Sequence, residues 1–147
     1  GVLDYNGNRF KTVGYGSVET EAGLPMPERL KLLYDGLTEI IQKYEPDEVS
    51  IEELFFNRNV TTAIGVGEAR GVAMLACVEG GLIVSEYTPM QIKQALVGYG
   101  KAEKAQVQMM VKTILNLPEV PKPDDTADAV AAAICHAHSR NARGLGR

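Results

Sequence analysis

The order in which extended and helical patterns follow one another along the chain limits the folds that are open to it. Two extended segments come first, Val2 to Tyr5 and Arg9 to Glu19, and the turn residues Asn6 and Gly7 between them predict a hairpin. Helical and extended patterns then alternate along most of the remaining chain. This order is typical of an α/β domain built around a mixed sheet.

The alternating part contains helical patterns with apolar residues at three- and four-residue steps, and short extended runs between them. Pro46 ends the first of these helices. The helices are expected at Leu30 to Tyr44, Asn59 to Glu79, Pro89 to Val97, Ala102 to Asn116 and Asp124 to Ser139, and the strands at Glu48 to Ile51 and Leu82 to Tyr87.

Length and composition limit the class of protein. A chain of 147 residues fits one domain, 1–147, with a basic and flexible tail expected at 140–147. With 45% hydrophobic and 23% charged residues it is neither disordered nor of membrane type, and no uninterrupted apolar run reaches the roughly 18 residues of a spanning helix. Cys77 and Cys135 lie in helical stretches, which suits reduced thiols and a cytoplasmic location better than a disulfide framework.

Two acidic side chains at the start of the last helix are candidates for metal binding. Asp125 and Asp128 are three residues apart, so their carboxylates project from one face and can share a cation. The ordinary alternative is that aspartates in a first turn cap free N–H groups and suit the positive helix end. Asp124 is the expected cap, which leaves the other two less explained.

A third candidate carboxylate follows a strand. Glu52 ends the extended run before it, and open α/β sheets place ligand sites at the C-terminal ends of strands. Glu53 must point the opposite way if the strand continues, so only one of the pair can face a site. A solvent-facing acid at a strand end is the ordinary alternative.

Basic and aromatic side chains offer a possible surface for nucleic acid. Lys93 and Lys104 flank a glycine-containing loop, with Lys101 nearby, and these lysines fit either a phosphate track or a solvated helix surface. Phe55 follows the acidic pair, where its ring could stack on an unpaired base or pack over a sheet edge. Arg58 adds charge whose placement the sequence leaves open. The net charge of -4 is a weak objection, because clustering matters more than the total.

Two further motifs are disfavoured. Cys135, His136 and His138 are one to three residues apart on one helix and do not converge as zinc ligands. The glycines from Gly65 to Gly71 depart from the dinucleotide-binding spacing and lie within a helical pattern.

An ordered series of segments resembles the bacterial RuvC-type Holliday junction resolvases over nearly the whole chain. No single short motif carries the resemblance, but the ordered set is highly specific. The matching segments are Ser50 to Phe55 with Asn59, Gly67 to Ala73, Ile92 to Gln94, Val97 to Gly100, Ala102 to Val107 and Asp125 to Ala129.

This resemblance implies an RNase H-like fold, with a mixed β-sheet flanked by helices, and an endonuclease that nicks four-way junction DNA in recombination and repair. It also implies a homodimer, a branch-migration helicase partner and Mg²⁺, with Mn²⁺ able to substitute. Glu52, Asp125 and Asp128 are then catalytic metal ligands. The implied DNA-binding residues are Phe55, Lys93 and Lys104, and we expect Arg58 and Lys101 to add to them.

The chain departs from the family pattern at its start. Family members begin with a strand that ends in Asp-Pro-Gly, and Gly1 matches the last glycine of the turn after it. We therefore expect the first central strand and one catalytic aspartate to be missing, and Asp4, which matches a position inside the second strand, does not replace it. Catalysis by the chain as given is then in question.

Three functions remain for comparison. A Mg²⁺-dependent endonuclease would use two metal ions to hydrolyse a phosphodiester. A non-catalytic junction-binding or DNA-binding module would bind with steep salt dependence but would not cut. A small-ligand α/β domain would show ligand-dependent melting and indifference to DNA.

Overall fold

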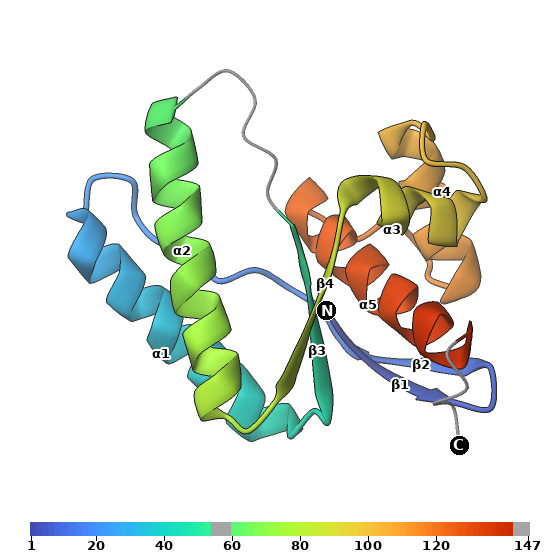
Figure 1. Cartoon of the computed structure of the whole chain (residues 1–147), viewed down its shortest axis with the longest axis horizontal. Coiled ribbons are helices and arrows are strands. Elements are labelled where there is room, and N and C mark those ends of the chain that lie inside the picture. The colour runs from blue at the N-terminus through green and yellow to red at the C-terminus, as the bar shows by residue number, and fades with distance from the viewer. Residues whose placement is uncertain (54–59, 143–147) are drawn as a thin grey trace. The chain divides into compact units, whose positions relative to one another are not determined.

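The fold is α/β, as the order of patterns predicts. The computed structural model describes residues 1–53 and 60–142 (Figure 1). The chain divides into two compact units: unit 1 comprises residues 1–17, 50–53 and 85–147, and unit 2 comprises residues 18–49 and 54–84. That they act as the single domain expected for 1–147 stays a prediction.

Unit 1 opens with the predicted hairpin, in which β1 (Val2–Asn6) pairs antiparallel with β2 (Arg9–Gly14). The turn is shifted by one residue from the prediction, because Asn6 pairs with Arg9 and the two turn residues are Gly7 and Asn8. Both have positive φ, 55° and 68°, which glycine and asparagine tolerate in a two-residue turn. β2 stops at Gly14 because its partner at that point, Val2, begins β1.

Three helices complete unit 1: α3 (Pro89–Val97), α4 (Lys104–Ile114) and α5 (Asp124–Ala142). Thr88 and Gln91 form a capping box before α3, and Glu103 and Gln106 form one before α4. The second box explains why α4 begins later than predicted, since Glu103 serves as its cap.

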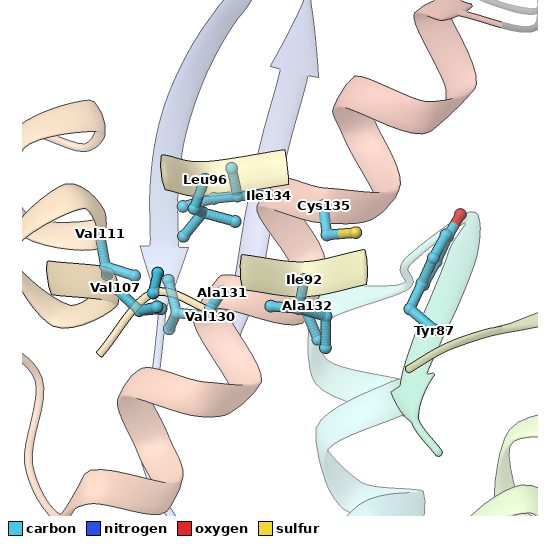
Figure 2. Close-up of a cluster of buried hydrophobic side chains, with 11 residues drawn as sticks. Tyr87, Ile92, Leu96, Val107, Val111, Val130, Ala131, Ala132, Ile134 and Cys135 are labelled. Carbon is cyan, nitrogen blue, oxygen red and sulfur yellow. The ribbon is translucent and has the colours of Figure 1, made fainter. Parts of the chain in front are cut away.

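The core of unit 1 surrounds α5 (Figure 2). Val130, Ile134 and Cys135 of this helix and Val111 of α4 are all 0% exposed. Ala131 and Ala132 of α5 are also buried in this core. The helix continues three residues beyond the predicted end at Ser139, and residues 143–147 of the expected tail lie outside the described part of the chain.

The second sheet consists of β3 (Glu48–Glu52) and β4 (Ile83–Tyr87). The backbone N–H of Glu53, just after β3, donates to the carbonyl oxygen of Tyr87 at 2.8 Å. Both strands begin in unit 2 and end in unit 1. The ends of β3 and β4 therefore belong to the same unit as α5.

Unit 2 contains α1 (Met26–Tyr44) packed on α2 (Val60–Glu79) (Figure 1). The hydroxyl of Tyr34 donates to the carboxylate of Glu79. At the end of α2 a Cβ on Gly80 would lie 2.8 Å from Ile41, so glycine permits this approach.

The α2 helix is more apolar than expected. Within the described residues, Thr61–Glu79 is the one helix that is long and apolar enough to cross a membrane, by length and composition alone. Glu68 and Arg70 lie within this helix, so its apolar sequence is not continuous, and the prediction that no apolar run reaches this length is not contradicted. One such helix is weak evidence for a membrane protein.

Candidate active site

Three predicted carboxylates belong to unit 1. Glu52 is the last residue of β3, while Asp125 and Asp128 occupy the first turns of α5. Residues far apart in the sequence thus supply acidic groups to one compact unit. Their side chains differ in exposure, since Asp125 is exposed and Asp128 is half-buried.

The Glu52 carboxyl group interacts with the acids of α5. Burial raises its pKa above the ordinary value of 4.5, and repulsion from Asp128 and, more weakly, Asp125 adds to the rise. Lys93 and Lys104 act in the opposite direction. Although Glu52 as a residue remains accessible to solvent, its carboxyl group therefore lies in the electrostatic field of all four predicted site residues.

The pKa of Asp128 is raised as well. Burial raises its pKa above the ordinary 3.8, the Lys104 ammonium lowers it, and Asp125 and Asp124 raise it. Its side chain is 38% exposed, and its Oδ2 lies 3.9 Å from Nζ of Lys104. The predicted acids therefore interact electrostatically, and the positively charged ammonium group of Lys104 lies close to them.

Lys104, at the start of α4, joins two acids of α5. Its Nζ lies 3.2 Å from Oδ2 of Asp124 as well as near Asp128. The hydrogen bond to Asp124 is the main reason that the pKa of Lys104 is raised. Gln108 also donates to Asp124, at 3.2 Å.

The prediction for Asp124 needs correction. It was expected to be the cap of the last helix, but α5 begins at Asp124 itself, one residue inside the cap position. Its carboxylate instead helps to hold Lys104 beside the site. Three aspartates within five residues were the only sequence signal for this role.

The other predicted DNA-binding residues are placed only in part. Lys93 lies on α3, and Lys101 is exposed in the segment between α3 and α4. Lys93 acts on both Glu52 and Asp128, so it belongs to the same group of charges. Phe55 and Arg58 lie outside the described residues.

The site fits a metal ion in the chemistry of its side chains but not in their present arrangement. Carboxylate oxygens are the donors that Mg²⁺ prefers, so the chemistry of the donor set fits. Among residues 1–53 and 60–142, however, no three His, Cys, Asp or Glu side chains already stand together as a ligand set. The acids share an electrostatic field without closing on a common point.

Comparison with known proteins decides the family. The model of the family described as "Crossover junction endodeoxyribonuclease RuvC" matches residues 1–136. The chain belongs to the RuvC family. The "Crossover junction endodeoxyribonuclease RuvC" of Desulforamulus reducens is 58% identical over 137 residues, which are 93% of this chain and 84% of that protein. The RuvC of Alkaliphilus oremlandii is 57% identical over 141 residues, or 96% of this chain and 86% of its own.

Solved RuvC structures agree with the fold. Thermus thermophilus RuvC in complex with Holliday junction substrate is 36% identical, has a TM-score of 0.90, and is matched over 99% of this chain and 88% of that one. A second structure of Thermus thermophilus RuvC gives a TM-score of 0.86 at 35% identity. The RNase H-like fold class expected from the resemblance is confirmed. RuvC proteins are endodeoxyribonucleases, hydrolases that act on DNA phosphodiester bonds, and are metal-dependent as a class.

Proposed function

We propose that this RuvC-family protein resolves four-way DNA junctions in recombination and repair as a Mg²⁺-dependent endonuclease, with Mn²⁺ able to substitute. The observation that carries the proposal is the coupled group of Glu52 and Asp128, set beside Lys93 and Lys104 in one unit. Acids supply ligands for cations, and lysines supply contacts for phosphates. The free thiols of Cys77 and Cys135 fit a cytoplasmic protein.

Each residue has a proposed task. Glu52, Asp125 and Asp128 hold divalent cations, which when bound would activate water and offset charge on the leaving oxygen. Lys104, now paired with the acids, contacts a DNA phosphate together with Lys93. The same proposal assigns DNA contacts to Phe55, Arg58 and Lys101.

In the metal-free protein, protonation of Glu52 and Asp128 limits how many carboxylates are available to bind a metal ion. The raised pKa values of Glu52 and Asp128 mean that both groups hold protons to a higher pH than ordinary carboxyls. Because the ligand form is the carboxylate, metal affinity should rise with pH until both groups are ionised. Lys93 and Lys104 moderate this effect by favouring ionised acids.

The test is cleavage of a synthetic four-way junction. We expect Glu52→Gln and Asp128→Asn to abolish cutting while sparing binding, because each removes a metal ligand but leaves the lysines in place. Glu53→Gln is the matched control, since it makes the same change on the neighbouring residue and should cut normally. Normal cutting by either site variant would refute the assignment.

The catalytic assay should include the chain with and without an added first strand. The prediction that a strand bearing a further catalytic aspartate precedes Gly1 stays a prediction. Cleavage is therefore measured for the 147-residue chain and for the chain extended by a strand ending in Asp-Pro-Gly. We expect cutting by the extended chain, and weaker or no cutting by the shorter one.

A second candidate function is a non-catalytic junction-binding module. It is favoured by the lack of a ready three-ligand group among the described residues. Such a module would bind four-way junctions with steep salt dependence, and neither Mg²⁺ nor the added strand would produce cleavage. The same assay therefore separates the two candidates.

We further propose that the protein forms a homodimer through α2 and works with a branch-migration helicase. Support for the dimer comes from large apolar residues that α2 leaves exposed: Ile64 is 60%, Leu75 53% and Val78 61% exposed. Leu75→Lys should shift the protein to monomers in sedimentation experiments. Leu32→Lys on α1, where leucine is 46% exposed, is the matched control and should leave the oligomeric state unchanged.

A further inference from the structure

Side chains of β3 and β4 hydrogen-bond to α5 at two points. Ser50 Oγ donates to the carbonyl oxygen of Ala132 at 2.9 Å. The Tyr87 hydroxyl lies 2.7 Å from Nδ1 of His136, and Tyr87 is only 5% exposed. Both contacts are partly buried, where a hydrogen bond is stronger and its loss more costly than at the surface.

The first contact is spaced so as to align two proposed metal ligands. Ser50 and Glu52 are two residues apart on one face of β3, a step of about 7 Å along a strand. Asp128 and Ala132 are one turn apart on α5, a step of about 6 Å along a helix. Because the two steps nearly match, joining Ser50 to Ala132 brings Glu52 level with Asp128.

The second contact fixes the helix on the neighbouring strand. His136 lies one turn beyond Ala132 on α5, and Tyr87 ends β4. The bond from Glu53 N–H to Tyr87 ties the two strands to each other. Together with the Ser50 contact, the Tyr87–His136 bond joins α5 to two different strands, which opposes both sliding and rotation of the helix.

We propose that Ser50 and the Tyr87–His136 pair are positioning residues that set the register of α5 on β3 and β4, so that Asp125 and Asp128 face Glu52 and can close on a bound ion. This inference rests on the proposed function for its metal site. Displacements of about 1 Å in a catalytic group can cost about a hundredfold in rate, so small shifts of α5 matter.

The test removes single hydroxyl groups and keeps the packing. Tyr87→Phe and Ser50→Ala each delete one contact. Ser50→Thr is the conservative variant, because threonine keeps a hydroxyl group at this position. The matched control is Tyr5→Phe, because the Tyr5 hydroxyl also bonds to α5, accepting from Asn141 near the far end of the helix. Thermal melting of every variant measures general destabilisation.

Two readouts report the register. The first is the rate at which a short thiol-reactive cross-linker joins Glu52→Cys to Asp128→Cys, which needs neither metal nor DNA. The second is Mn²⁺ affinity of the protein with both acids intact, followed by electron paramagnetic resonance.

We expect Tyr87→Phe and Ser50→Ala to slow cross-linking and to weaken Mn²⁺ binding about threefold to tenfold, below the range for residues that bond directly to a ligand. Tyr5→Phe and Ser50→Thr should change neither readout. Unchanged cross-linking in both deletion variants, or an equal loss in Tyr5→Phe, would overturn the inference. Failure of the parent protein to bind Mn²⁺ would count against the proposed function alone, because the cross-linking rate still decides the register.

Discussion

If Glu52 and Asp128 share a Mg²⁺ ion, the free energy of interaction between the two carboxylates should change sign when the ion binds. We expect it to be unfavourable without Mg²⁺ and favourable with it. In the metal-free protein the charge of Asp128 repels the Glu52 carboxylate, and this repulsion adds to the effect of burial in raising the pKa of Glu52. In the metal-bound protein the two carboxylates should act together. A double-mutant cycle of Glu52→Gln and Asp128→Asn isolates the interaction from the separate effects of each change.

The magnitude follows from exposure and linkage. Asp128 is 38% exposed and Lys104 lies 3.9 Å from it, so solvent and a counter-charge both weaken the repulsion. We therefore estimate an unfavourable coupling of about 0.5 kcal/mol, the scale of partly exposed charge pairs. Mg²⁺ at about a hundred times its Kd stabilises the folded parent by about 2.7 kcal/mol, and each single variant should lose this gain. The coupling should then become favourable by about 2 kcal/mol.

The assay is urea denaturation of the parent, both single variants and the double variant at neutral pH, with EDTA and with Mg²⁺. Glu53→Gln replaces Glu52→Gln in a control cycle, which should show little coupling in either condition. A coupling free energy that keeps its sign and size on adding Mg²⁺ would refute the idea of a shared ion.

Further predictions concern pH, salt and the core. Because the pKa values of Glu52 and Asp128 are raised in the folded state, the folded protein holds these two protons more tightly than the unfolded chain does. This contribution to the free energy of unfolding is fully present below the ordinary pKa values of 4.5 and 3.8, and it is lost as the pH rises through the folded-state values. Metal-free urea unfolding from pH 4 to 7.5 should therefore show the double variant gaining stability relative to the parent as pH rises; a constant difference would contradict the shifts. Lys93→Gln should flatten the dependence of junction affinity on salt by about 0.9 in log–log slope, as loss of one phosphate contact requires, and an unchanged slope would remove Lys93 from the DNA surface. Ile134→Ala, at a side chain that is 0% exposed, should lower the free energy of unfolding by about 2 to 5 kcal/mol in urea, and a cost below about 1 kcal/mol would mean that this part of the core is loosely packed.

Local chemistry explains why most elements could be predicted. The α3 helix lies at the predicted bounds because Pro89 and the Thr88 capping box define its start and Gly98, with φ of 97°, defines its end. The hairpin was also expected, but its turn was placed one residue early. Asn6-Gly7 and Gly7-Asn8 are both acceptable turn sequences, so only the pairing of Asn6 with Arg9 decides between them.

The acidic residues of the candidate site could be predicted from the sequence, but the charge pairs that they form could not. Strand-end and helix-start positions pointed to Glu52, Asp125 and Asp128, and the family resemblance selected Glu52 over Glu53. The pairing of Lys104 with Asp124 had no comparable signal, because it joins the starts of two helices separated by a proline-containing segment.

The succession of strands and helices could be predicted from the amino-acid sequence, because turns, caps and apolar periodicity act between residues that are near in the chain. The sequence also indicated the RuvC family, through an ordered set of segments. Packing between distant segments sets which acids affect one another, places Lys104 among them, and joins Ser50 and Tyr87 to α5. Those relations depend on how helices and strands pack across long separations in sequence, and Coulomb and hydrogen-bond energies depend on the resulting distances.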